Sequence, residues 1–189
     1  MQFNIKTNFP EVQRKLLAMQ KDIASKALAS ALNKTAAQAK TAMSREIRAE
    51  FNMTAATVNQ SLLVKRASAS GGSFNLTAEL SSISKRGKRS LNIARFAARQ
   101  TSKGVTFKIK KGGPRKLIPG AFLINSGATV MIRSGKKRLP IEARQTIDVP
   151  QMFNTKRINA KVLQMIEAKF PELFAHEAKF FIDRFNAKR

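Results

Sequence analysis

Residues 11–50, EVQRKLLAMQKDIASKALASALNKTAAQAKTAMSREIRAE, contain neither proline nor glycine and are rich in alanine. Apolar side chains recur every three or four positions from Val12 to Phe51, which is the spacing of one face of an α-helix. The stretch predicts a helix of about 40 residues, roughly 60 Å long, whose alanines permit close packing on another element or subunit. Two helices broken between Ser30 and Asn33 are the alternative.

The residues before this stretch predict where the helix starts. Asn8 can cap it, Pro10 suits the first turn, and Glu11 completes an Asn-x-x-Glu capping box. The helix is therefore expected to begin near Phe9, after a short strand within residues 2–6.

The middle of the chain reads as short strands joined by turns. Thr54 is expected to cap a short helix that precedes a strand at residues 62–67. A DNA-recognition helix at residues 54–62 is disfavoured because no paired second helix is apparent. Further strands are predicted within FNLTAEL (74–80), GVTFKIKK (104–111), KLIPGAFLIN (116–125) and ATVMIR (128–133).

Alternation within one of these strands predicts how it packs. Val105, Phe107 and Ile109 are expected to face inward, and the intervening Thr106, Lys108 and Lys110 outward. Pro119 is expected in an edge or bulged strand, because proline cannot donate a hydrogen bond to a ladder.

The C-terminal part returns to amphipathic helix. Asn154 or Thr155 is expected to cap a helix over residues 158–170, and Pro171 to open a second helix over residues 171–189. The predicted fold class is α+β, with a long N-terminal helix, a central, mostly antiparallel β-sheet or partial barrel, and C-terminal amphipathic helices. We expect one domain made of three regions, 1–53, 54–153 and 154–189.

Charge is the most unusual property of the chain. There are 36 Lys and Arg against 11 Asp and Glu, a formal net charge of +25 at pH 7. The stretch from Leu80 to Ile141 holds 16 basic residues and no acidic one, whereas the two helical ends are mixed. Such a surplus repels itself unless a polyanion or an acidic neighbour offsets it.

The basic residues of the middle region form three clusters in or beside predicted turns, where long cationic side chains can reach phosphates. A solvated charged face is the alternative, but the absence of acidic residues favours contact with DNA or with an acidic partner. Because Tyr and Trp are absent, backbone-directed contact is favoured over base stacking. The predicted contact residues are Lys85, Arg86, Lys88, Arg89, Lys108, Lys110, Lys111, Arg115, Lys116, Arg133, Lys136, Lys137 and Arg138.

Catalytic chemistry finds little support in the residues present. The chain has no cysteine and a single histidine, His176, which is expected to be solvated. Ser-x-x-Lys occurs at Ser82 and Ser134 without the partner motifs of acyl-transfer enzymes. We predict that the protein is not an enzyme and uses no cofactor or metal. No apolar run is long enough to cross a membrane.

Three short motifs carry a family resemblance. Ile118-Pro119-Gly120-Ala121-Phe122 is followed by a basic turn, by Leu139-Pro140-Ile141, and by Val149-Pro150 shortly before Phe153. With ALNKTA in an early alanine-rich helix and a very basic middle, this succession resembles the prophage minor tail protein Z family, also called tail completion proteins. The motif residues are expected in packing or at a subunit interface.

The resemblance implies a structural virion protein at the head-proximal end of a phage tail, acting in tail completion and head-tail joining around the DNA passage. It implies assembly in the host cytoplasm and partners among tail and neck proteins, such as the tail terminator and tail tube, with contact to phage DNA. A homo-oligomeric ring, sixfold by analogy with tail symmetry, is expected. The alternative is a sequence-independent nucleic-acid-binding protein of ribosomal or chromosome-associated type.

Overall fold

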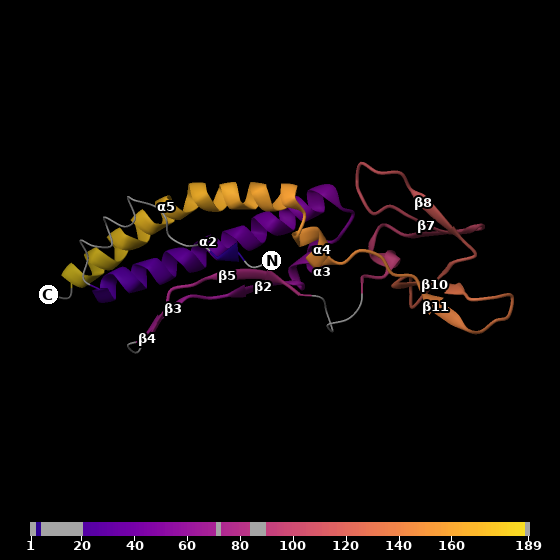
Figure 1. The fold of residues 1–189 in the computed structure, drawn as a ribbon, viewed down its shortest axis with the longest axis horizontal. Helices are drawn as coiled ribbons and strands as arrows, with labels where there is room; N and C mark the ends of the chain where they lie inside the picture. Colours follow the sequence, from indigo (N-terminus) through magenta and orange to yellow (C-terminus); the bar gives the residue numbers. More distant parts are fainter. Residues whose placement is uncertain (1–2, 5–20, 71–72, 84–89, 188–189) are drawn as a thin grey trace. The chain divides into compact units, whose positions relative to one another are not determined.

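Two long helices and a series of short strands make up the computed structural model of the chain. The structure describes residues 3–4, 21–70, 73–83 and 90–187. Over these residues the strands form several small antiparallel sheets beside the helices, and none closes into a barrel (Figure 1). The predicted α+β class is confirmed, but the strands are divided among small sheets and do not form one central sheet.

The chain divides into two compact units, each built from segments distant in the sequence. The first unit contains Met1–Met43, Leu62–Ser81 and Lys156–Arg189. The second contains Ser44–Ser61 and Ser82–Thr155. Whether the units act as the single domain expected from the sequence stays a prediction.

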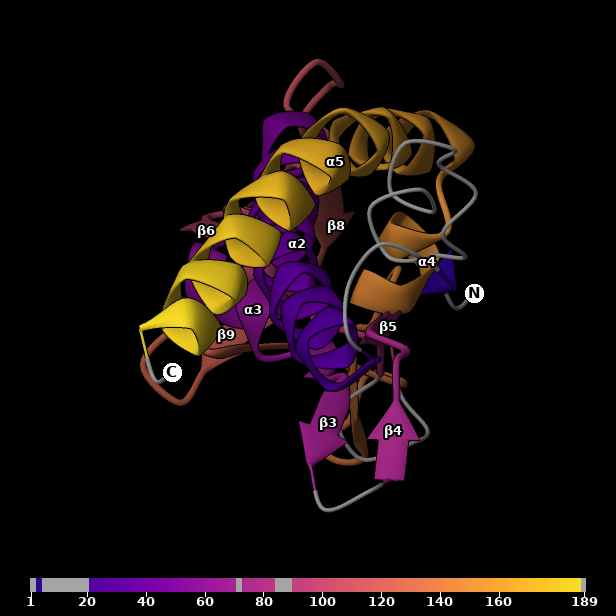
Figure 2. The same ribbon diagram turned by 90° about the vertical axis from the view of Figure 1, so that its left-hand side faces the viewer.

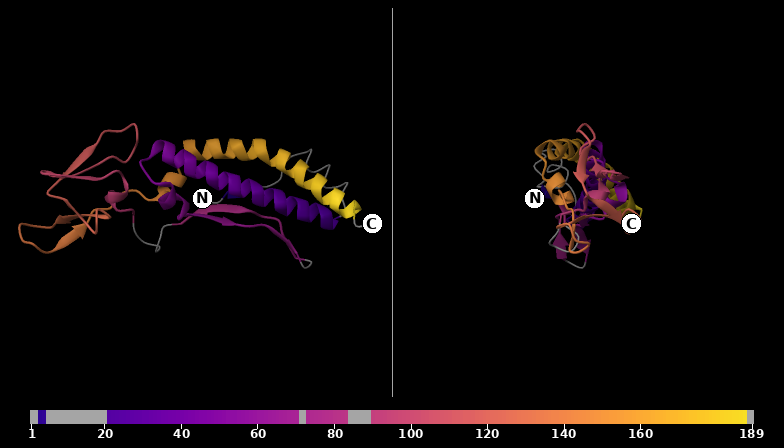
Figure 3. Two further views of the ribbon diagram at one scale, coloured as in Figure 1. Left: turned by 180° about the vertical axis from the view of Figure 1, so that it is seen from behind. Right: turned by 90° about the vertical axis from the view of Figure 1, so that its right-hand side faces the viewer.

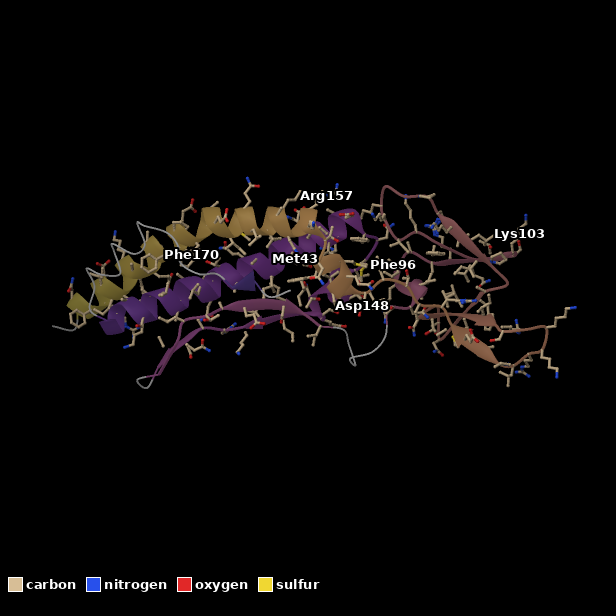
Figure 4. All side chains as sticks on the ribbon, viewed as in Figure 1. Met43, Phe96, Lys103, Asp148, Arg157 and Phe170 are labelled. Atoms are coloured by element: carbon tan, nitrogen blue, oxygen red, sulfur yellow. The ribbon has the colours of Figure 1, made fainter. Side chains whose placement is uncertain are left out.

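The first unit is organised around helix α2 (Lys21–Glu50). Figures 1, 2 and 3 show the unit's part of α2 between helix α5 (Lys156–Asn186) and the strands. Ala27 and Ala31 are fully buried in a core that also holds Phe170 of α5, which points towards α2 (Figure 4). Small residues let both neighbours approach the α2 backbone, as the alanine-rich sequence predicts.

Helix α2 runs without interruption from residue 21 to residue 50, so the two-helix alternative is wrong over the described residues. The polar positions that suggested a break have partners in other elements. Asn33 donates to the carbonyl of Ala67 (2.9 Å) and accepts from its amide (2.8 Å). The Ser30 hydroxyl donates to Glu177 (2.6 Å). The expected start near Phe9 lies outside the described residues.

Helix α5 is also continuous, and the prediction that Pro171 opens a separate helix is wrong. An internal proline removes one hydrogen bond and costs about 3 kcal/mol. Phe170 and Phe174 are both fully buried, with ring centroids 6.4 Å apart. Burying two aromatic side chains on either side of the proline offsets that cost.

Over the described residues, five short strands complete the first unit. Residues 74–80 do not form the single strand expected, because their two ends pair with different partners and the residues between them belong to no strand. β5 lies between β1 and β2, and β3 pairs with β4. The strands are β1 (Phe3–Asn4), β2 (Leu62–Lys65), β3 (Ser68–Ser70), β4 (Ser73–Asn75) and β5 (Glu79–Ser82).

The second unit contains two three-stranded sheets with strand orders β6-β7-β8 and β9-β10-β11. Its apolar core joins Val105 and Phe107 of β7 with Ile93, Ala121 and Val130. Its elements are α3 (Ala55–Asn59), the 3-10 helix η1 (Ile93–Arg95), β6 (Arg99–Thr101), β7 (Gly104–Phe107), β8 (Lys116–Pro119), β9 (Phe122–Ile124), β10 (Thr129–Arg133), β11 (Ile141–Ala143) and α4 (Val149–Phe153).

Of the two short helices in this unit, the start of one was predicted from the sequence and the start of the other was not. Thr54 caps α3 by accepting from the amide of Thr57, as predicted, and α3 is a short connector followed by a strand. The capping box of Asp148 and Gln151 at the start of α4 was not anticipated.

The segment KLIPGAFLIN forms two strands in separate sheets, where one strand was expected. Pro119 ends β8, which is an edge strand as predicted. Gly120 then turns the chain with a φ of +67°, a backbone conformation that favours glycine. Opposite this turn, a Cβ on Gly104 would lie 2.1 Å from the carbonyl oxygen of Ile118, so glycine is required there as well.

Candidate polyanion-binding surface

The second unit carries most of the net charge. It contains 19 basic and 4 acidic residues, against 17 and 7 in the first unit. Nine of the predicted contact residues are described by the structure and all nine lie in this unit; Lys85, Arg86, Lys88 and Arg89 fall outside the described residues. These nine residues therefore lie between β7 and the start of β8 and at the end of β10 and the turn that follows it.

The first group of cations lies on the outward face of the β6-β7-β8 sheet. Thr106 is paired in register with Arg99 and with Leu117, so these three side chains share one face. The Arg115 guanidinium donates to the Ala97 carbonyl (3.0 Å) and to the Thr106 hydroxyl (3.4 Å). Arg115 thereby braces the sheet while remaining exposed.

The lysines that follow β7 are held on a backbone tied to the end of α2. The amide of Asn52 donates to the Ile109 carbonyl (2.8 Å), and its side chain donates to the Lys108 carbonyl (3.0 Å). The Lys111 amide donates to the Glu50 carbonyl (2.8 Å). The Lys110 ammonium lies 3.7 Å from the Glu50 carboxylate. Three positive charges are thus presented from a fixed strand end.

The third group surrounds the tip of the β10–β11 hairpin. Ser134 closes the tip by donating from its amide to the Pro140 carbonyl (3.1 Å) and from its hydroxyl to Glu142 (2.7 Å). The Arg133 guanidinium lies over the Phe122 ring, 4.8 Å from its centroid. At the tip, Lys136, Lys137 and Arg138 are all exposed.

The structure adds basic residues that the sequence prediction omitted. Arg95, Arg99, Lys103 and Arg144 belong to the same unit, and Lys103 lies in the turn between β6 and β7 (Figure 4). The first three fall within the stretch that lacks acidic residues. All four are exposed, so the positive charge of this unit is not confined to the three clusters seen in the sequence.

The family-motif residues divide between core and surface. Ala121, Val149 and Phe153 are buried and serve packing. Ile118, Phe122, Ile141 and Pro150 are partly buried. Pro119, Gly120, Leu139 and Pro140 are exposed, with Leu139 at 66% exposure. A role of the motif residues at a subunit interface stays a prediction.

Two side-chain amides, which the sequence prediction missed, form hydrogen bonds with the backbone of distant strands in the second unit. The Asn92 side chain donates to the Val130 carbonyl (3.2 Å) and accepts from the Val130 amide (2.8 Å). The Gln100 side chain likewise accepts from the Leu123 amide (2.9 Å). A single asparagine or glutamine carries no sequence signal for such long-range pairing.

Buried charge also occurs in the first unit, which does not contain the predicted contact residues that the structure describes. The Glu177 carboxylate, whose side chain is 4% exposed, contacts the Lys34 ammonium and accepts from the Ser30 hydroxyl. Burial acts to raise the pKa of Glu177, but hydrogen bonds from Lys34, Ser30 and His176 and the charge of Lys34 outweigh it and lower the pKa to about 2. This cluster is a stabilising ion pair.

The single histidine and the two Ser-x-x-Lys sequences are not arranged as a catalytic site in the described residues. His176 is exposed and lies beside Glu177, as expected of a solvated histidine. The Ser134 hydroxyl is occupied by Glu142, and Lys85 lies outside the described residues. Within the part of the chain that the structure describes, no three His, Cys, Asp or Glu side chains gather as metal ligands, and no helix is long and apolar enough to cross a membrane.

A family comparison identifies the class of protein. The family model of Prophage minor tail protein Z (GPZ) matches residues 10–188 of the 189-residue chain. The chain belongs to the prophage minor tail protein Z family. No curated protein and no solved structure matches it.

Membership of the minor tail protein Z family confirms the resemblance read from the motifs. It makes this protein a structural component of a phage tail, and the family is not a known class of enzyme. The match covers segments of both compact units.

Proposed function

We propose that this minor tail protein acts at the head-proximal end of the tail, in tail completion and head-tail joining around the DNA passage. Its membership of the minor tail protein Z family supports a place in the tail. The observation that carries the proposal is the charge of the second unit, which contains 19 basic and only 4 acidic residues. A passage for DNA is an environment in which such a surplus is stabilised by phosphates.

The proposed contact is electrostatic and independent of base sequence. Lys136, Lys137 and Arg138 are exposed at one hairpin tip, where their long side chains can approach a phosphate backbone or an acidic ring neighbour. No Trp or Tyr is available for base stacking. Contacts of this kind position a protein on DNA without reading its sequence.

Assembly into a homo-oligomeric ring, a hexamer by analogy with tail symmetry, forms part of the proposal. A ring would multiply the charge of each subunit, so close packing would require DNA or acidic neighbours such as the tail terminator or tail tube. The exposed motif residues Pro119, Gly120, Leu139 and Pro140 are the proposed surface for these contacts. Assembly would take place in the host cytoplasm before the protein enters the virion.

Two measurements on purified protein test the proposal. Size-exclusion chromatography with mass detection, with and without tail tubes of the same phage, should show a discrete ring or co-elution with tubes. Binding to a DNA duplex, measured between 50 and 300 mM salt, should show a steep salt dependence. Alanine at Lys136, Lys137 and Arg138 should reduce the slope of log K against log salt by about 2.7, at about 0.9 per phosphate contact.

A matched variant in the first unit controls for the loss of charge alone. Alanine at Lys65, Arg66 and Lys179 removes the same number of charges from exposed positions outside the second unit. For this variant, the slope of log K against log salt should stay within about 1 of the wild-type slope, as expected for the loss of at most one phosphate contact. A monomer that ignores tail tubes but binds nucleic acid tightly would instead support the ribosomal or chromosome-associated alternative.

A further inference from the structure

The second unit contains an apolar pocket whose lining includes two of the predicted contact lysines. The pocket has a volume of about 320 Å³, and its walls are almost wholly apolar. Phe107, Ile109, Pro114 and Ile147 supply the apolar walls. This volume lies at the small end of the roughly 300–1,000 Å³ range of ligand pockets, which suits a single bulky side chain better than a cofactor.

Positive charge lines the opening of this pocket. Lys110 and Lys116 both belong to its lining, and Lys111 and Arg115 lie between them in the sequence. Two acidic residues lie near it: Glu50 is 3.7 Å from the Lys110 ammonium and offsets part of its charge, and buried Asp148 accepts from the amide of Val149. The four cations outnumber these two acids. The opening therefore has a net positive charge that an acidic ligand would complement.

The framework around the pocket is formed before any ligand arrives. Asn52 and Glu50 hold the segment that carries Ile109 and Lys110 through two backbone hydrogen bonds of 2.8 Å and one bond of 3.0 Å from the Asn52 side chain. Phe107 belongs to the buried core of the unit. A preformed pocket binds without the cost of ordering its own walls.

We propose that this pocket docks an acidic segment of another protein through one bulky apolar side chain, with flanking carboxylates on Lys110 and Lys116. The apolar walls recognise the anchor residue, and the lysines recognise the acids around it. Buried apolar anchors inside a charged rim are the usual source of binding energy at protein interfaces. This inference goes beyond the proposed function, because it does not require DNA contact or ring formation.

A pair of glycine variants tests the pocket with little risk to the fold. Gly113 lines the pocket, and a Cβ there meets only Lys110 at 3.5 Å, an ordinary contact. A Cβ on Gly112 meets nothing within 4 Å. Gly113→Leu should fill the pocket, whereas Gly112→Leu adds the same side chain outside it. Equal thermal melting of both variants and the wild type verifies that the fold is retained.

The probe is a fluorescein-labelled peptide, Asp-Glu-Asp-Phe-Asp-Glu-Asp, compared by fluorescence anisotropy with the same peptide carrying Ala in place of Phe. The wild type should bind the Phe peptide at least tenfold more tightly, and Gly112→Leu should keep that preference. Gly113→Leu should reduce it to less than threefold. Lys116→Glu should weaken both peptides by a similar factor and leave the preference for Phe intact.

Location is verified by the methyl resonances of Ile109 and Ile147, which should shift on addition of the Phe peptide and stay in place with the Ala peptide. Equal affinity for the two peptides, or an unchanged preference in Gly113→Leu, would overturn the proposal. It would also be overturned if single-stranded DNA, and not the Phe peptide, lost binding in Gly113→Leu. None of these results bears on the salt slope of duplex binding, so the two proposals fail separately.

Discussion

Replacing Glu177 with Gln removes the buried carboxylate of the first unit and should make stability depend less on pH. In the native protein the pKa of Glu177 is lowered from 4.5 to about 2. A folded-state pKa below the unfolded value stabilises the protein above the unfolded pKa, and this stability is lost as the pH falls through the folded value. At 1.36 kcal/mol per pKa unit, the shift corresponds to about 3 kcal/mol at pH 7.

The assay is urea unfolding of the wild type and of Glu177→Gln at pH 7, 5, 4 and 3, followed by far-UV circular dichroism. The free energies of unfolding should differ by about 3 kcal/mol at pH 7 and pH 5. The difference should shrink between pH 4.5 and pH 2, because the wild-type carboxyl becomes protonated in that range.

Glu172→Gln is the matched control on the same helix. Glu172 lies 2.8 Å from Lys169, but its side chain is 67% exposed, and exposed ion pairs contribute only about 0–1 kcal/mol. A difference between wild type and Glu177→Gln that stays constant from pH 7 to pH 3 would refute the assignment of the stability to an ionised Glu177. A similar loss in Glu172→Gln would refute the role of burial.

Further variants test the second unit. Asn92→Ala removes both hydrogen bonds to Val130 and should lower the free energy of unfolding by about 2 kcal/mol, measured by urea unfolding. Gly104→Ala places a Cβ 2.1 Å from the Ile118 carbonyl oxygen at a φ of +142° and should cost about 3 kcal/mol. Gly112→Ala faces open space and should change stability by less than about 0.5 kcal/mol, so an equal loss in both glycine variants would contradict the steric explanation.

Several predictions that rested on near neighbours in the chain were confirmed. The spacing of apolar residues placed α2 over its whole described length, and Thr54 caps α3. In β7, Val105 and Phe107 are buried as their alternation predicts. Helical and strand periods are local properties, so one sequence is enough to reveal them.

The candidate surface was predicted only in part. Charge counting found the region, since the absence of acidic residues is visible in the sequence. It did not show that Arg115 braces Thr106 and Ala97 while the hairpin-tip cations remain exposed. Charge is additive along a chain, whereas the role of each cation depends on what lies opposite it in the fold.

The sequence by itself determined the α+β class, the amphipathic faces, the edge position of Pro119 and the sign of the surface charge. Only the tertiary structure excluded the break between Ser30 and Asn33 that the sequence left open, and only it showed that α5 continues past Pro171 and that Ile147 joins residues 107–116 around a pocket. These outcomes depend on partners far away in the sequence, such as Ala67 for Asn33. Contacts between distant residues can override a local breaking signal, because burial and paired hydrogen bonds outweigh the propensity of a single residue.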